Sequence, residues 1–420
     1  MPTDRLTICF IPWLLFNETD RYADILSEVR ERGFNCIRFD DGAGFLWKAD
    51  GTERENVKVH APFGKYTKYT TYKTITNGTI RPLERLLKIC RTASQFGIRV
   101  ILCSWFYLHT NWFFEYEETR PYFALSAEEK IAFFSSELDR ILSALRREGL
   151  LDTVAFAELF NEFDGIPWFR GSARPTPEEA AELRTLHEQA IAALKEHHPE
   201  VLFAFDTLTP TPMEELIPRN ADVFDFHFYY AWGLYNAFEQ NLCRPTLEEP
   251  VIPEETRYFL KKDNVSVKDV AAAMNGDIRT GLDWPRRISL YASIDPAKEG
   301  ELNELLEKSF QEKAPVIQKN IVDRVEKMLE IHDRIIPNSR IVMGEGVTYC
   351  ASPTLTFEAT SKVFWSLIEE HMRCYREKGF WGSVISTTHA PDRSAAWGPC
   401  KEIYIDINKK FSDEFSLFDK

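Results

Sequence analysis

Short apolar runs alternate with amphipathic helical segments along the whole 420-residue chain, and this alternation limits the possible folds most strongly. Between most of the runs, apolar residues recur at the three- and four-residue spacing of one helix face. Runs that are apolar over their full length fit parallel strands buried on both faces. Eight such runs are present, at residues 6–10, 34–39, 98–105, 153–161, 201–205, 223–229, 341–344 and 380–386.

Eight strands separated by helices are the number found in a (β/α)8 TIM barrel. An open, doubly wound α/β sheet shows the same alternation, but it would most readily carry a glycine-rich phosphate loop after an early strand. Neither G-x-G-x-x-G nor G-x-x-x-x-G-K-[ST] occurs in the sequence. We therefore predict that residues 1–420 form a single (β/α)8 barrel.

The regular pattern breaks over residues 231–312, where prolines, tryptophans and charge pairs mix with short apolar pieces. We predict a long insertion here, between the sixth strand and the sixth main helix, whose apolar face resumes at Val316. Loops that follow strand carboxyl ends build the active site of a barrel. The insertion could therefore act as a lid, a wall of the substrate site or a dimer contact.

The acidic charge balance excludes several partners. Lysine and arginine total 51 against 65 aspartates and glutamates, giving a net charge of −14. Nucleic-acid backbones and anionic membranes would be repelled, so neither is expected as a partner. The apolar run at 8–16 is too short to span a bilayer and has no small-residue cleavage site. We predict a cytoplasmic protein, although a secreted form with its signal removed would look the same; the oligomeric state is not predictable.

The cysteines and histidines show no metal-binding arrangement. The eight cysteines include no C-x-x-C pair, and neither H-x-H nor H-E-x-x-H occurs. We therefore predict neither a metal nor a cofactor. Cys9, Cys36 and Cys103 lie within apolar runs, where cysteine behaves as a small buried hydrophobe. Free buried thiols fit a reducing compartment.

Polar residues at the ends of the predicted strands are the candidates for catalysis, because barrel enzymes place their chemistry there. Two glutamates hold matching positions: Glu162 ends the fourth run and Glu345 ends the seventh. A retaining glycosidase needs two carboxyl groups about 5–5.5 Å apart. Either glutamate alone would be interpreted as a solvated loop residue, but the pair predicts a catalytic function. Arg38 and His227 could keep one carboxylate ionised, and Tyr229 could donate a hydrogen bond to it.

Four short motifs, in the right strand order, resemble those of the cellulase-like glycoside hydrolases of clan A, the 4/7 superfamily. The segment F-A-E-L-F-N-E-F at 156–163 resembles the family's E-L-x-N-E-P, and M-G-E-G at 343–346 resembles its seventh-strand nucleophile segment. C-I-R at 36–38 resembles N-x-I-R, and H-F-Y at 227–229 resembles H-x-Y.

The resemblance implies a role for each matching residue. Glu162 would be the acid/base and Glu345 the nucleophile. Asn161 would hold the 2-hydroxyl of the sugar. Arg38 would support the nucleophile, and Tyr229, with His227 beside it, would contact it.

The sequence departs from this family in two places: Phe163 replaces the usual proline, and the eighth run lacks the usual tryptophan at its end. Trp397, in the following loop, is the candidate replacement for that stacking platform. Trp13, Trp105 and His109 follow strand ends and are predicted to contact the substrate. Glu158 lies four residues before Glu162, on the same strand face, and is predicted to pair with a cation such as Arg38 in a structural role.

The predicted function is that of a retaining glycoside hydrolase acting on a β-linked glycoside or oligosaccharide. The alternative is a non-catalytic carbohydrate-binding barrel that has lost hydrolase activity. A third interpretation, a barrel enzyme that abstracts protons, lacks the lysine, metal ligands or phosphate loop that such enzymes generally need. The sequence does not reveal the sugar, the linkage or whether cleavage is endo or exo.

Overall fold

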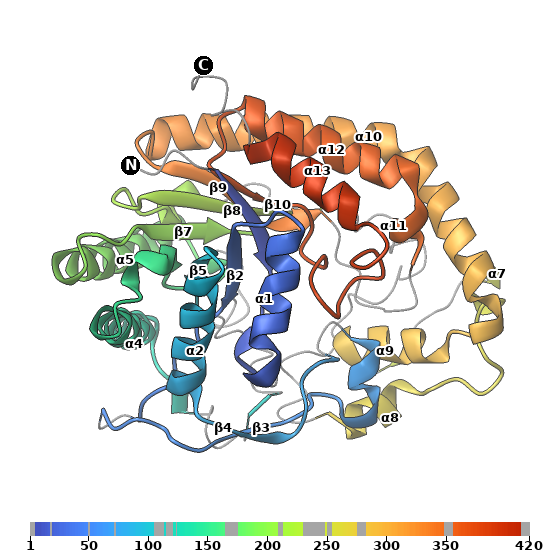
Figure 1. Cartoon of the computed structure of the whole chain (residues 1–420), viewed down its shortest axis with the longest axis horizontal. Coiled ribbons are helices and arrows are strands. Elements are labelled where there is room, and N and C mark those ends of the chain that lie inside the picture. Colours follow the sequence, from blue (N-terminus) through green and yellow to red (C-terminus); the bar gives the residue numbers. More distant parts are fainter. Residues whose placement is uncertain are drawn as a thin grey trace.

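Eight parallel strands close into a barrel in the computed structural model (Figure 1). The structure describes residues 5–16, 19–48, 51–70, 73–104, 113–114, 121–122, 124–163, 175–208, 213–229, 248–249, 254–274, 283–347 and 356–412. The barrel strands are β1 (Leu6–Phe10), β2 (Cys36–Asp40), β5 (Arg99–Cys103), β6 (Val154–Glu158), β7 (Phe203–Thr207), β8 (Val223–Tyr229), β9 (Arg340–Val347) and β10 (Gly382–Val384). Each pairs with the next in chain order, and β10 pairs with β1, so the predicted (β/α)8 barrel is confirmed.

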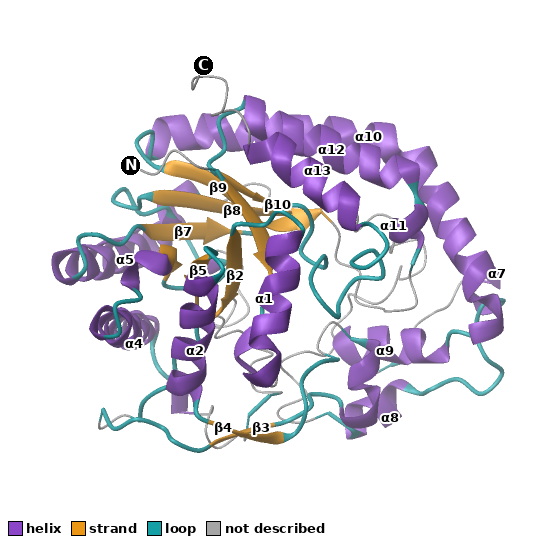
Figure 2. Ribbon diagram, in the orientation of Figure 1, coloured by secondary structure: helices purple, strands orange, loops and turns teal. Residues whose placement is uncertain are grey.

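Helices surround this barrel (Figure 2). The main ones are α1 (Tyr22–Glu31), α2 (Pro82–Gln95), α4 (Ala127–Arg147), α5 (Pro177–His197), α10 (Glu299–Ile335), α12 (Lys362–Glu377) and α13 (Lys401–Ser412). Shorter helices are α7 (Glu254–Arg257), α8 (Val267–Ala272), α9 (Asp283–Ser293) and α11 (Phe357–Thr360). In Figure 1, α10, α12 and α13 lie along one side of the barrel, while α4 and α5 pack together on another.

Local sequence determines where several of these helices begin. Ser126 caps α4 by accepting from the Glu129 N–H, while the Glu129 carboxylate accepts from the Ser126 N–H. Thr176 and Glu179 form the same reciprocal pair at α5. Each pair satisfies donors that the first helical turn leaves without a partner. Both helix starts were predictable from four residues of sequence.

Two elements differ from the prediction. Helix α10 begins at Glu299 and runs through Pro315, so the last part of the predicted 231–312 insertion belongs to this helix. A hairpin of β3 (Val57–Val59) and β4 (Gly78–Ile80) follows β2 and was not predicted from the sequence. Between β7 and β8, the described residues include a short 3-10 helix, Glu214–Leu216.

The segments that follow β2 and β8 meet each other. These strands are second and sixth in a barrel of eight, so they lie on opposite sides of it. The Phe63 ring, from the segment after β2, stacks on Trp284 of α9 with ring centroids 6.2 Å apart. Gly64 also lies against the Ala273 carbonyl that follows α8. Two segments that follow strands on opposite sides of the barrel therefore contact each other at its carboxyl end.

The predicted burial of Cys9, Cys36 and Cys103 is confirmed, and each is a free thiol. None of the helices that the structure describes combines the length and apolar character needed to cross a membrane.

Candidate active site

The two predicted catalytic glutamates come together at the carboxyl end of the barrel. Glu162 follows β6, and Glu345 lies in β9. A carboxylate oxygen of each, together with a ring nitrogen of His227, lies within 4.8 Å of the other two. Both side chains are buried, with residue exposures of 7% for Glu162 and 2% for Glu345. This spacing is similar to the separation of about 5–5.5 Å between the two carboxyl groups of retaining glycosidases.

A register shift in the pairing of β8 with β9 directs Glu345 into this site. Phe226 pairs with Met343, but the next residue, His227, pairs with Glu345, so Gly344 is the extra residue of a β-bulge. A Cβ on Gly344 would lie 2.0 Å from the Asp225 carboxylate, so only glycine fits there. The Gly344 N–H donates to Asp225 Oδ1 at 2.6 Å. The glycine before Glu345 is therefore required by packing.

Glu162 has an unusual main-chain conformation. Its φ of 52° lies in the left-handed region, which residues other than glycine rarely occupy. Its N–H donates to Asp206 Oδ2 at 2.8 Å, and its carboxylate contacts His227 Nδ1 at 2.9 Å. Non-glycine residues held in this region often lie at functional sites.

Arg38 is fully buried at the centre of an acidic cluster. Its guanidinium binds Glu345 Oε1 and donates to Glu158 Oε2 at 2.7 Å and to Asn161 Oδ1 at 2.8 Å. Asp206 and Asp225 also lie within ion-pair distance of it, at 3.3 and 4.0 Å. The predicted pairing of Glu158 with Arg38 is confirmed. One buried cation thus faces four carboxyl groups.

The surroundings of Glu345 act on its ionisation in opposite directions. Burial raises the pKa of Glu345 above its ordinary value, and the negative charge of Glu162 adds to this effect. His227, Arg38 and a hydrogen bond from Tyr229 oppose the rise. The Tyr229 hydroxyl lies 2.5 Å from Glu345 Oε2, and the hydroxyl of Thr387 lies 3.3 Å from that of Tyr229.

Two acidic residues in the barrel interior were not predicted from the sequence. Asp206 of β7 and Asp225 of β8 are buried, and burial raises the pKa of both carboxyl groups well above the ordinary value. Burial also acts to raise the pKa of Glu158, but Arg38 and hydrogen bonds lower it overall. The available signal was one aspartate directly after the apolar run 201–205 and another inside the run 223–229, positions that disfavour a charged side chain unless it has a partner.

One predicted substrate-binding tryptophan, Trp397, lies away from the carboxylate pair, and the prediction for it is wrong. Trp397 packs between α1 and α13, where its indole N–H donates to Glu28 Oε2 at 2.7 Å and Arg32 lies over its ring at 4.4 Å. Its ring is therefore not available as a stacking platform. Trp13 is 4% exposed and packs on Phe113 at 4.2 Å within an aromatic cluster, and its substrate contact stays a prediction. The predicted contacts of Trp105 and His109 fall outside the described residues.

Glu162, His227 and Glu345 are close enough together to share a cation. Their oxygen and nitrogen atoms, however, already bind one another, Arg38 and Tyr229. A metal among them would compete with the contacts that His227 and Tyr229 make to the two carboxylates, and would lie near the fixed positive charge of Arg38. The residues therefore fit an acid/base site better than a metal centre, and the expectation of no cofactor stays a prediction.

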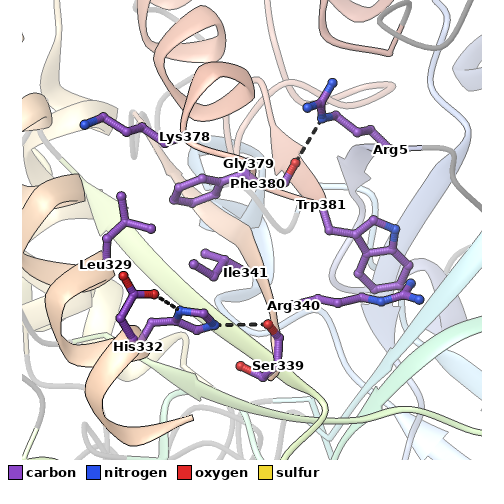
Figure 3. Close-up of a pocket in the computed structure, with 11 residues that line it drawn as sticks. Arg5, Leu329, His332, Ser339, Arg340, Ile341, Lys378, Gly379, Phe380 and Trp381 are labelled. Atoms are coloured by element: carbon purple, nitrogen blue, oxygen red, sulfur yellow. Dashed lines mark hydrogen bonds and ion pairs between the residues drawn. The ribbon is translucent and has the colours of Figure 1, made fainter. Parts of the chain in front are cut away.

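A cavity of about 600 Å³ opens at the opposite end of the barrel (Figure 3). It is lined by the first residue of β9, Arg340, by residues just before β1 and β10, and by the end of α10. Among the described residues that line it, Asp333 is the only acid, and it is hydrogen-bonded to His332. Without a pair of carboxyl groups it cannot carry out glycoside hydrolysis, so the carboxyl end of the barrel is the candidate site.

The fold and this carboxylate pair define a barrel of the glycoside hydrolase type. A family model described as "Cellulase-like: Sugar-binding cellulase-like" matches residues 12–247, more than half of the chain. The chain belongs to this cellulase-like family. No curated protein sequence matches it significantly.

Solved structures with the same fold share little sequence with this chain. A protein from Parabacteroides distasonis, provisionally named a glycoside hydrolase, has a TM-score of 0.66 and 16% identity, over 98% of this chain and 94% of that one. The endo-β-1,4-mannanase from Thermotoga petrophila has a TM-score of 0.50 and 12% identity, over 98% and 78%. ZgEngAGH5_4, solved in complex with a cellotriose, has a TM-score of 0.51 and 11% identity, over 96% of each chain.

Proposed function

We propose that the protein is a retaining glycoside hydrolase that cleaves β-linked glycosides by double displacement. The observation that carries this proposal is the pair Glu162 and Glu345, with carboxylate oxygens within 4.8 Å of each other in different surroundings. Glu345 lies against Arg38 and Tyr229, which favour its ionised form. Glu162 bonds instead to His227, which can accept or donate a proton.

The first chemical step forms a covalent intermediate. The ionised Glu345 attacks the anomeric carbon, and the bond between that carbon and the glycosidic oxygen breaks. Glu162 donates its proton to the departing oxygen, so the aglycone leaves neutral. The product of this step is a glycosyl ester on Glu345, with a Glu162 carboxylate beside it.

The second step releases the sugar. Glu162 removes a proton from water, which attacks the anomeric carbon, and the ester bond to Glu345 breaks. Two inversions at one carbon give net retention. Arg38 stabilises the negative charge that returns to the Glu345 carboxylate when the ester bond breaks. Asn161 directly precedes Glu162 in the chain, and its Oδ1 accepts at 2.8 Å from Arg38, which also binds Glu345; it is proposed to hold the sugar 2-hydroxyl.

The joined segments at the carboxyl end of the barrel favour short substrates. A long polysaccharide bound along its middle needs a groove that is open at both ends. The stacking of Phe63 on Trp284 joins the segments after β2 and β8, and we infer that this contact closes one end of such a groove. We therefore propose that the protein binds the end of a short β-linked chain and releases small products from it.

A non-catalytic sugar-binding barrel is the competing function. Loss of catalysis usually removes selection on the residues that support the nucleophile, yet Arg38, Tyr229 and the Gly344 bulge all remain in contact with Glu345 or its neighbour. A 2-deoxy-2-fluoro glycoside discriminates between the two functions. It forms a stable ester on Glu345 in a retaining enzyme, whereas a binding protein releases it unchanged.

Azide rescue of two variants tests the assignment of roles. Glu345→Ala should lose turnover of aryl β-glycosides, and azide should restore it with formation of an α-glycosyl azide, because azide replaces the nucleophile. Glu162→Ala should instead give a β-glycosyl azide, because azide then attacks the ester on Glu345. Full activity in Glu345→Ala, or the same azide anomer from both variants, would contradict the assignment.

A further inference from the structure

We propose that Asp206, on the fifth barrel strand, positions the acid/base Glu162 for the reaction, and that Asp225, on the sixth, has the equivalent role for the nucleophile Glu345. This inference rests on the proposed function. Asp206 and Asp225 do not touch the reacting atoms directly. Each binds the main chain at a catalytic glutamate or at the residue next to it.

Asp206 holds the main chain at Glu162. Its Oδ2 accepts from the Glu162 N–H at 2.8 Å, and both residues are buried. With φ at 52°, the Glu162 main chain occupies a region that a residue with a Cβ adopts only when its surroundings impose it. The hydrogen bond to Asp206 is one contact that opposes relaxation of this conformation. Loss of it should let the Glu162 carboxyl group move away from the glycosidic oxygen.

The same aspartate also faces the histidine that binds Glu162. Asp206 Oδ2 lies 3.7 Å from His227 Nε2, while His227 Nδ1 contacts Glu162 Oε1 at 2.9 Å. The buried imidazole ring thus lies between the two acids. Asp206 therefore acts on both the main chain and the side-chain partner of Glu162.

Asp225 makes the matching contact on the neighbouring strand, β8, where it pairs in register with Asp206. Its Oδ1 accepts from the Gly344 N–H at 2.6 Å, immediately before Glu345 and at the bulge that directs Glu345 into the site. Asp225 lies 4.0 Å from Arg38, and Asp206 lies 3.3 Å from it. Since both aspartates are buried beside the same guanidinium, replacing either one changes a similar charge environment. The two residues are therefore matched controls for each other.

The two positions should affect different parts of the reaction. If the acid/base is displaced, hydrolysis slows for glycosides whose poor leaving group must be protonated. Glycosides with good leaving groups need no proton and are hydrolysed at almost the same rate. A displaced nucleophile slows both kinds of substrate. A general loss of packing would also slow both. Only a role of Asp206 in positioning Glu162 makes the loss of kcat/KM depend on the leaving group.

The experiment compares phenyl and 2,4-dinitrophenyl β-glycosides of the same sugar in Asp206→Ala, Asp206→Asn and Asp225→Ala. In Asp206→Ala, kcat/KM for the phenyl glycoside should fall about 100-fold more than for the dinitrophenyl glycoside, in line with the usual contribution of general acid catalysis. Asp206→Asn keeps an oxygen that can accept from the Glu162 N–H, so most of this difference should disappear. Asp225→Ala, which removes the acceptor for the Gly344 N–H, should slow both substrates by similar factors.

Equal losses on the two substrates in Asp206→Ala, or no loss on either, would overturn the proposal. If Asp206→Ala does not fold, Asp206→Leu removes the same acceptor with a side chain of similar size, and the same comparison applies. Wild-type protein is tested first for labelling by the 2-deoxy-2-fluoro glycoside. A wild type that is neither labelled nor active contradicts the proposed function itself, whereas a labelled wild type with equal losses in the variant contradicts only the role of Asp206.

Discussion

Replacing Tyr229 with phenylalanine should weaken catalysis through Glu345 alone. The substitution removes one hydroxyl, which lies 2.5 Å from Glu345 Oε2, and keeps the ring. Hydrogen bonds to charged groups contribute about 1.5–3 kcal/mol. At about 1.4 kcal/mol for each factor of ten, the loss in kcat/KM is roughly 10- to 150-fold. Because Tyr229 is partly exposed, water can replace some of this hydrogen bond, and we expect a value in the lower half of the range.

The same change should alter the pH dependence in a defined direction. The Tyr229 hydrogen bond opposes the rise that burial causes in the pKa of Glu345. Its removal should therefore raise that pKa further. Since Glu345 must be ionised to attack, activity is lost as pH falls through its pKa. The acidic limb of kcat/KM should consequently move to higher pH in Tyr229→Phe.

The assay is the pH profile of kcat/KM for an aryl β-glycoside, with thermal unfolding of each variant measured in parallel. Tyr22→Phe is the matched control, because the buried Tyr22 hydroxyl donates to the Leu15 carbonyl at 3.2 Å and does not contact Glu345. This control should leave the acidic limb unchanged. A Tyr229→Phe enzyme with wild-type kcat/KM and an unmoved acidic limb would refute the reasoning.

Further predictions concern the wild-type pH profile, stability and products. The acidic limb of wild-type kcat/KM should lie above 4.5, the ordinary value for a glutamate, because burial raises the pKa of Glu345; a limb at or below 4.5 would contradict this. Arg38→Met should lower the free energy of unfolding at pH 7 by about 3–5 kcal/mol, measured with urea, because it leaves buried carboxylates unpaired. The loss should shrink at acidic pH, where these carboxyl groups are protonated; a loss that does not change with pH would count against the acidic cluster. Wild-type protein should release small products from β-linked oligosaccharides, and Trp284→Ala, which removes the stacking on Phe63, should raise activity on longer chains relative to a disaccharide. Mid-chain cleavage of a soluble β-glucan or β-mannan by the wild type, seen as an early fall in viscosity, would exclude the proposed end-on binding.

The barrel and the two glutamates were predictable because both depend on local patterns. Strand and helix periods mark the elements, and a closed parallel barrel brings all strand carboxyl ends to one side. Glu162 and Glu345 therefore meet although 183 positions separate them in the chain. The pairing of Arg38 with Glu158 followed from strand alternation in the same way.

Features that depend on long-range packing were not predictable. Asp206 and Asp225 are each an ordinary aspartate in the sequence, and their contacts with Glu162 and Gly344 appear only once β6 to β9 are side by side. Trp397 follows the eighth strand as a substrate-binding tryptophan would, but its hydrogen bond to Glu28 fixes it between α1 and α13. A residue's place after a strand end does not determine the direction of its loop.

The anomeric configuration of the first product tests the central claim most directly. Proton NMR during hydrolysis of an aryl β-glycoside identifies the hemiacetal before mutarotation mixes the two anomers. Carboxylate oxygens within 4.8 Å of each other predict that the β-anomer appears first. Initial release of the α-anomer would require a water molecule between Glu162 and Glu345, and would contradict the geometry on which the mechanism rests.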